Sequence, residues 1–196
     1  MSRLRETPSQ TVGPYFALRL GGEGQNVLAG PDAAGQRVRI SGQVFDGDGA
    51  FIEDALLEVW QADAQGRYRH PDDRWSDEPL DDDAFTGFGR AWSDFTSGEY
   101  VIETVKPGRV PGPDGRPQAP HLNLIVQARG MLNPSFTRVY FSDEAEANDE
   151  DGVLAQVPPE RRTTLVASLE DPAAEPTSYR FDLRFGGASE TVFLDF

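Results

Sequence analysis

The segment Ala119-Pro120-His121-Leu122-Asn123-Leu124-Ile125-Val126 has the pattern of a β-strand, and the rest of the fold is organised around it. Leucine or valine occupies every second position from Leu122 to Val126, which is the two-residue period of a pleated strand. His121 and Asn123 take the alternate positions, so their side chains should share one face and reach a common point in front of the sheet. That geometry suits a bound metal or substrate. However, the neutral amide of Asn123 stands where a pair of metal ligands would need a second imidazole.

Other segments with this alternation predict that the chain is mainly β. They are separated by turn signals such as Asp46-Gly47-Asp48-Gly49, and no long helical pattern lies between them. The expected strands cover residues 38–45, 55–60, 99–105, 136–141, 179–185 and 190–196. One helix is expected from Pro159 to Leu169, because proline suits a first helical position and apolar residues recur on one side. The pattern therefore predicts a β-sandwich or barrel with long loops and one or two short helices.

The composition limits the class of protein and its partners. The chain has 196 residues, enough for one domain with a sizeable core, and we expect a single domain over 1–196. Its net charge of -15 argues against nucleic acid and anionic membranes as partners, since both would repel it. The absence of cysteine excludes disulfides and thiolate chemistry. Residues 1–6 lack the apolar core of a signal peptide and no apolar run reaches transmembrane length, so a cytoplasmic location is expected.

Residues 6–20 form an expected N-terminal arm. Pro8, Gly13 and Pro14 prevent a continuous helix there, so we expect local turns whose aromatic residues pack on another surface. One interpretation is a terminal segment that covers a sheet edge. The other is an arm that packs on a partner subunit.

Tyr68 is a candidate ligand in the loop that follows strand 55–60. It lies between Arg67 and Arg69, whose positive charges should favour the ionised phenolate, a hard donor suited to ferric ion. The alternative is a tyrosine whose ring packs and whose hydroxyl finds a hydrogen-bond partner.

A third place of interest is the turn Lys106–Pro111, where a side chain at Val110 should project from the loop leading to the His121 strand. The three segments occur in a fixed order, with Phe88-Gly89-Arg90 and Gly98-Glu99-Tyr100 between the first two. Together they resemble the intradiol ring-cleaving dioxygenases over nearly the full chain. Within that family, the arm Thr11–Phe16 and the final segment Glu190–Phe196 are similar to alpha subunits that act with a beta subunit on protocatechuate.

The resemblance implies a β-sandwich of mixed topology and an αβ protomer assembled into larger oligomers. It also implies a reaction in which protocatechuate and dioxygen give 3-carboxy-cis,cis-muconate, by cleavage between the two hydroxyl-bearing carbons. The arm, residues 1–20, would then pack on the beta subunit.

The same resemblance implies a ferric site built from two tyrosines and two histidines. Tyr68 and His121 match one of each, whereas Val110 and Asn123 stand where the second tyrosine and histidine would be. Valine offers no donor and a neutral amide is a poor ligand for a hard trivalent ion. We therefore expect no metal and no catalytic residue in this chain alone, a degenerate site at these four positions, and Fe(III) in the beta subunit.

The resemblance also assigns substrate-binding residues to the wall of the beta-subunit site. They are Thr11, Gly13, Pro14 and Tyr15 of the arm, together with Arg129 after the His121 strand. Arg129 could steer the substrate carboxylate, which an acidic protein would otherwise repel. The alternative for Arg129 is a surface arginine paired with a nearby carboxylate.

A second class of function is open at this point, a stand-alone β-sandwich binding module that has kept the frame and lost the chemistry. Val110 and Asn123 would be equally natural in such a module. A one-chain catechol dioxygenase is disfavoured by the missing ligands. An arm that packs against a beta subunit would favour the subunit over the module.

Overall fold

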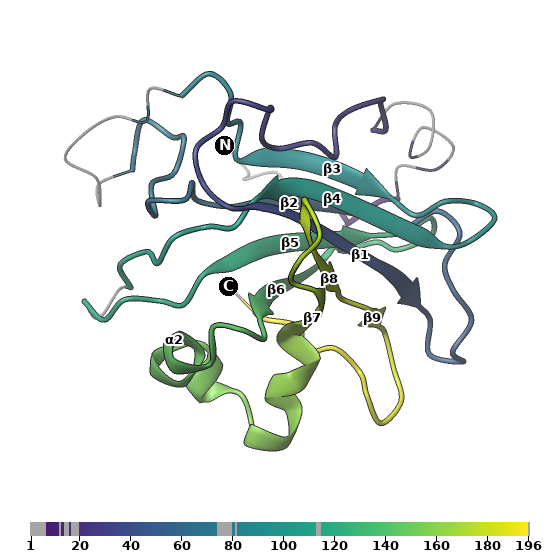
Figure 1. Cartoon of the computed structure of the whole chain (residues 1–196). Coiled ribbons are helices and arrows are strands. Elements are labelled where there is room, and N and C mark those ends of the chain that lie inside the picture. The colour runs from purple at the N-terminus through teal and green to yellow at the C-terminus, as the bar shows by residue number, and fades with distance from the viewer. Residues whose placement is uncertain are drawn as a thin grey trace, which may run out of the picture.

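The computed structural model describes residues 7–11, 13, 16, 20–73, 80, 82–112 and 115–195 (Figure 1). In these ranges the strands are β1 (Arg37–Phe45), β2 (Leu56–Trp60), β3 (Phe88–Trp92), β4 (Glu99–Val105), β5 (His121–Gln127), β6 (Ser135–Phe141), β7 (Val166–Asp171), β8 (Thr177–Arg180) and β9 (Leu183–Arg184). The helical segments are α2 (Ala145–Glu150) and two 3₁₀ helices, η1 (Leu154–Gln156) and η2 (Pro159–Leu165). No helix in the described ranges is long and apolar enough to cross a membrane.

The strands follow the order β3-β2-β5-β6-β7-β8-β1-β4, and β9 also pairs with β1. The first four strands pair antiparallel, whereas β6 and β7 pair parallel, as do β1 and β8. β7 therefore joins two groups of strands, because it pairs with β6 on one side and with β8 on the other. The expectation of mixed topology is confirmed.

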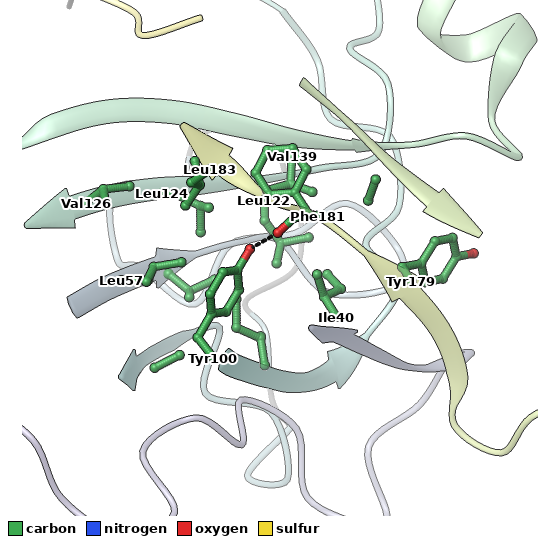
Figure 2. Close-up of a cluster of buried hydrophobic side chains, with 14 of the residues drawn as sticks. Ile40, Leu57, Tyr100, Leu122, Leu124, Val126, Val139, Tyr179, Phe181 and Leu183 are labelled. Atoms are coloured by element: carbon green, nitrogen blue, oxygen red, sulfur yellow. Dashed lines mark hydrogen bonds between the residues drawn. The ribbon is translucent and has the colours of Figure 1, made fainter. Parts of the chain in front are cut away.

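The two groups of strands face each other across one apolar core, which makes the fold a β-sandwich. Figure 2 shows Ile40 of β1 and Tyr100 of β4 in the same cluster as Leu57, Leu122 and Leu124 from β2 and β5. All of these side chains are at most 1% exposed. Burial of this apolar area is the main favourable term for such a fold.

The alternation predicted for the His121 strand is present in β5. Leu122, Leu124 and Val126 are buried in the core, while Asn123, Ile125 and Gln127 are partly exposed on the outer face of the sheet. The strands expected at 38–45, 55–60, 99–105 and 136–141 are likewise found within one residue of their predicted ends.

The helix expected from Pro159 to Leu169 is wrong in its second half. A 3₁₀ helix ends at Leu165, and Val166 begins strand β7. Pairing of β7 with β6 and β8 satisfies its backbone groups and favours the extended form over the local helical pattern.

Two further strand predictions need correction at the C-terminal end. The strand expected at 179–185 divides into β8 and β9, because the side chain of Asp182 accepts the backbone N–H of Gln43 at 3.1 Å, where a strand carbonyl would otherwise accept it. Residues 190–195 form no strand and make a single bridge between Leu194 and Phe136. β3 and α2 were not predicted at all.

Candidate functional site

The residues singled out in the sequence lie at the two ends of β5. His121 and Asn123 begin the strand, whereas Arg129 follows its last residue, Gln127. At about 3.3 Å per residue the strand separates these ends by about 20 Å. We call the region around His121 the closed end and the region around Arg129 the open end.

His121 is buried at the closed end, with 3% of its surface exposed. Its Nδ1 lies 2.8 Å from the carbonyl oxygen of Ala119, and since a carbonyl only accepts, Nδ1 carries the proton. Burial, and then the positive charge of Arg138, lower the pKa of His121 to about 4. His121 is therefore neutral at pH 7, and its Nε2 has no hydrogen-bond partner among the described residues.

Tyr68 stacks on Trp60 with ring centroids 5.8 Å apart and an interplanar angle of 7°. Burial raises the pKa of Tyr68, even though a hydrogen bond with the Asn123 side chain and the charge of Arg138 act in the opposite direction. The prediction of a phenolate is therefore wrong, and Tyr68 stays a neutral phenol at pH 7.

The reason lies in where the flanking arginines point. Arg67 pairs with Asp63 at 2.7 Å, and Arg69 pairs with Asp83 at 3.0 Å and donates to the carbonyl of Phe85. Both guanidinium groups are thus committed to other partners.

Val110, in the loop that leads to β5, is buried with 3% of its surface exposed. Its carbonyl accepts the backbone N–H of Gln118 at 2.7 Å. The loop that carries Val110 also lies close to the loop that carries Tyr68. A Cβ added to Gly66 would be 2.1 Å from the carbonyl oxygen of Arg109.

Asn123 uses both atoms of its amide group within the protein. Its Oδ1 accepts from Nε of Arg138 at 3.1 Å, and its Nδ2 donates to the carbonyl of Trp60 at 3.3 Å. The amide nitrogen is only a donor, and the guanidinium bonded to Oδ1 places a positive charge where a bound cation would have to lie.

Arg138 is the centre of this hydrogen-bond network, and the sequence analysis missed it. One of its terminal nitrogens donates to Oε1 of Gln118 at 2.7 Å and lies 3.4 Å from the hydroxyl of Tyr140. Tyr140 donates to Oδ1 of Asp151 at 3.1 Å, and Oδ2 of Asp151 accepts the N–H of Ala119 at 2.8 Å. All four predicted positions therefore join one network. Only the strand register reveals it, with Arg138 opposite Asn123 and Tyr140 opposite His121.

The closed end does not fit a ferric ion. Of the four positions, Val110 has no donor atom and the Asn123 amide is engaged, so only Tyr68 and His121 remain as possible ligands. The Arg138 guanidinium adds a positive charge to the same space. Within the described ranges, no group of three or more histidine, aspartate or glutamate residues could hold a metal.

The open end brings together two of the predicted substrate-binding segments. Thr11 lines a small cavity of about 50 Å³, together with Gln10, Phe16 and residues of the loop 127–134. The backbone N–H of Gly13 lies 3.4 Å from the Thr11 hydroxyl, and Gly13 has a φ of 65°. The predictions for Pro14 and Tyr15 fall outside the described residues.

Arg129 belongs to the same loop and is 70% exposed at its side chain. Its Nε lies 3.1 Å from Oδ2 of Asp54, a carboxylate that is only 8% exposed. The surface ion pair that was the alternative for Arg129 is therefore present. The guanidinium is nevertheless accessible from outside.

Comparison with known proteins connects this geometry to a family. The model of a family described as "Dioxygenase" matches residues 12–187. The chain is 45% identical over its full length to a protocatechuate 3,4-dioxygenase alpha chain of Burkholderia cepacia, all of which it covers. It is also 32% identical to a beta chain from the same organism, over 85% of this chain and 72% of that one.

A solved structure shows the same fold at low sequence identity. The dioxygenase domain of a carbohydrate-binding fusion protein from Streptomyces sp. SirexAA-E aligns with a TM-score of 0.60 and 22% identity. The alignment covers 93% of this chain and the whole of that domain. The sequence motifs of the chain resemble those of intradiol ring-cleaving dioxygenases. The family match and the similarity to an alpha chain show that the chain belongs to the dioxygenase family.

Proposed function

We propose that the chain is the alpha subunit of a protocatechuate 3,4-dioxygenase and pairs with a beta subunit that holds Fe(III). The complex would cleave protocatechuate with O2 to 3-carboxy-cis,cis-muconate. The observation that carries this proposal is the closed end, where Arg138 engages the amide of Asn123 and no ligand set for iron remains. The full-length similarity to alpha chains supports the subunit role, and the similarity to a beta chain supports a partner of related fold.

The open end is the part of the chain that would help catalysis, as one wall of the partner's substrate pocket. Thr11 and Gly13 would present backbone and hydroxyl groups to a flat ring, and the family resemblance assigns Pro14 and Tyr15 to the same wall. A Cβ at Gly13 would meet no atom within 4 Å, so the backbone is open to close approach on that side.

Arg129 would orient the substrate through its carboxylate. Its guanidinium can form two parallel hydrogen bonds to a carboxylate, which fixes direction as well as distance. Asp54 holds the side chain in place before substrate arrives and would have to share it afterwards. In a chain with net charge -15, such a local positive group also offsets the general repulsion of an anionic substrate.

Co-expression tests the subunit role. The full chain is purified alone and together with a beta chain, and iron content, visible absorption and ring cleavage are measured for each. We expect tyrosinate-to-iron absorption and activity in the complex only. Stoichiometric iron in the isolated chain would contradict the proposal. Failure of the two chains to associate would favour the stand-alone binding module.

Substitution of Arg129 tests the substrate role within the complex. Arg129→Ala should raise the apparent KM for protocatechuate by roughly tenfold, while the KM for catechol, which has no carboxylate, changes much less. Arg39→Ala is the matched control, because Arg39 is also exposed and paired with a carboxylate, that of Glu103. Equal effects of Arg129→Ala on both substrates would remove Arg129 from this role.

A further inference from the structure

The contacts of Arg138 indicate that its positive charge has a role of its own at the closed end. Arg138 lies on β6 directly opposite Asn123 of β5, and cross-strand neighbours on one face have Cβ atoms about 5 Å apart. Any imidazole placed at position 123 would therefore lie next to the guanidinium.

The second observation is the burial of this charge. Arg138 is 9% exposed, and its hydrogen-bond partners among the described residues are neutral: the side-chain oxygens of Asn123, Gln118 and Tyr140. Most other arginines of the described chain pair directly with a carboxylate, for example Arg90 with Glu58 and Arg180 with Asp182. A buried charge is normally costly unless such groups compensate it.

The third observation is what the guanidinium connects. Gln118, on the segment before β5, donates its amide to the carbonyl of Pro111 at 3.1 Å and accepts from Arg138. Arg138 thus links the Val110 loop, the start of β5 and, through Tyr140 and Asp151, the segment that precedes η1. A metal ion bound by side chains from several segments would connect the chain in the same way.

We propose that Arg138 is the built-in cation of the closed end: it joins the segments that a metal would join, and it excludes ferric ion even when the missing tyrosine and histidine are restored. The proposal rests on the ligand pattern of the family and not on the subunit role. In a variant with both residues restored, the Asn123 oxygen is gone, but the guanidinium stays buried opposite position 123, and its charge repels a trivalent cation bound there.

Reversion of the ligand positions tests this proposal on the full chain. The double variant Val110→Tyr/Asn123→His should still bind almost no iron. The addition of Arg138→Gln, which removes the charge and keeps an amide for hydrogen bonding, should raise bound iron by roughly tenfold and produce visible tyrosinate absorption. Iron is measured per chain by elemental analysis, so the result does not depend on activity.

Two controls separate charge from general loosening. Arg162→Gln, added to the same double variant, removes an arginine whose hydrogen bonds within the described ranges also go to neutral groups, the carbonyls of Val157 and Ala155. This variant should leave iron low. Arg138→Lys in the double variant keeps the charge and should also leave iron low. Stoichiometric iron in the double variant alone, or none in a folded triple variant, would overturn the exclusion.

A measurement on a single variant covers the case in which the triple variant does not fold. Arg138→Gln alone should increase amide hydrogen exchange of residues 118–123 at least several-fold, because their cross-link is lost. Arg162→Gln should leave exchange in that segment unchanged. Unchanged exchange in Arg138→Gln would show that Arg138 does not connect these segments, and the proposal would be abandoned.

Discussion

An arginine lies near each end of β5, and the two arginines differ in their exposure and in their partners. At the closed end Arg138 is 9% exposed, and three neutral side-chain oxygens surround it. At the open end Arg129 has one carboxylate partner and 70% of its side chain in solvent. The same residue type therefore stabilises the fold at one end and is available to another molecule at the other.

The difference shows that one scaffold can bury an arginine in a network at one end and present an arginine to solvent at the other. At the closed end, internal hydrogen bonds engage the side chains and leave no set of metal ligands free among the four positions. The open end keeps exposed polar groups on loops, where they contribute little to stability and can contact a partner. Substitutions at the two ends should accordingly have different consequences.

The largest effect is expected for Asp151→Ala at the closed end. Asp151 is fully buried and accepts from the backbone N–H groups of Ala119, Val153 and Leu154 and from the Tyr140 hydroxyl. Its removal leaves these donors unpaired, and we expect a loss of about 4 kcal/mol in unfolding free energy. Urea titration measures it. The exposed Asp48→Ala should stay within about 0.5 kcal/mol. Similar losses for both would mean that the closed end is not specially stabilised.

A smaller effect is expected when His121 is protonated. Its pKa of about 4 in the folded chain lies below its usual 6.5, so the unfolded chain binds the proton more tightly. The stabilisation is therefore complete above pH 6.5 and is lost as the pH falls towards 4, by about 3 kcal/mol. Arg138 and Asp151 are the charged groups that act on this imidazole.

The measurement for His121 is the unfolding free energy across pH 4 to 7 for the wild-type chain and for His121→Leu. The variant should lose much of the slope in this window, whatever its absolute stability. His70→Leu, on an exposed histidine, is the matched control. A slope that is identical in wild type and His121→Leu would show that the closed end does not hold a neutral imidazole.

The contact between the Tyr68 and Val110 loops gives a third prediction. Gly66→Ala places a Cβ 2.1 Å from the carbonyl oxygen of Arg109, at a residue whose φ is 82°. Gly49→Ala is matched in backbone conformation, with φ of 85°, but meets no atom within 4 Å. Thermal denaturation should show that Gly66→Ala costs about 2 kcal/mol more than Gly49→Ala. Equal costs would mean that only backbone strain matters and that the loops can separate freely.

The smallest effect is expected at the open end, where Arg129→Ala should lower stability by less than about 1 kcal/mol. The ion pair with Asp54 is largely solvated on the arginine side, which weakens it. Chemical denaturation of the variant checks this. A loss as large as that of Asp151→Ala would make Arg129 a structural residue and would weaken its proposed part in substrate binding.

Local pattern was enough to predict the strands whose alternation matches the core. In β5 apolar residues stand at every second position from Leu122, and their burial confirms that period. It failed where tertiary pairing decides the outcome. Val166 continues an apparent helical face but is extended because β6 and β8 are available as partners. Glu190–Asp195 alternates like a strand, yet it finds only the bridge at Phe136.

The structure brings the four candidate positions of the closed end together, whereas the contacts that connect them were not predicted. Tyr68, Val110, His121 and Asn123 belong to one network, as their shared role in the motif suggests. Arg138 could not be identified, because nothing in the sequence states that it lies opposite Asn123. The ionisation of Tyr68 was wrongly predicted for a similar reason. The arginines next to it in the sequence, Arg67 and Arg69, pair with other groups in the fold.

The pairing of β1 with β8 and β9 has a consequence for how the chain is made. β1 lies between β4 and the last strands of the chain, so its hydrogen bonds are completed only after residues 177–184 have left the ribosome. Until then the sandwich cannot close, and one edge of β1 stays exposed and unpaired. Any contact that needs the closed sandwich must therefore wait until β8 and β9 have paired with β1.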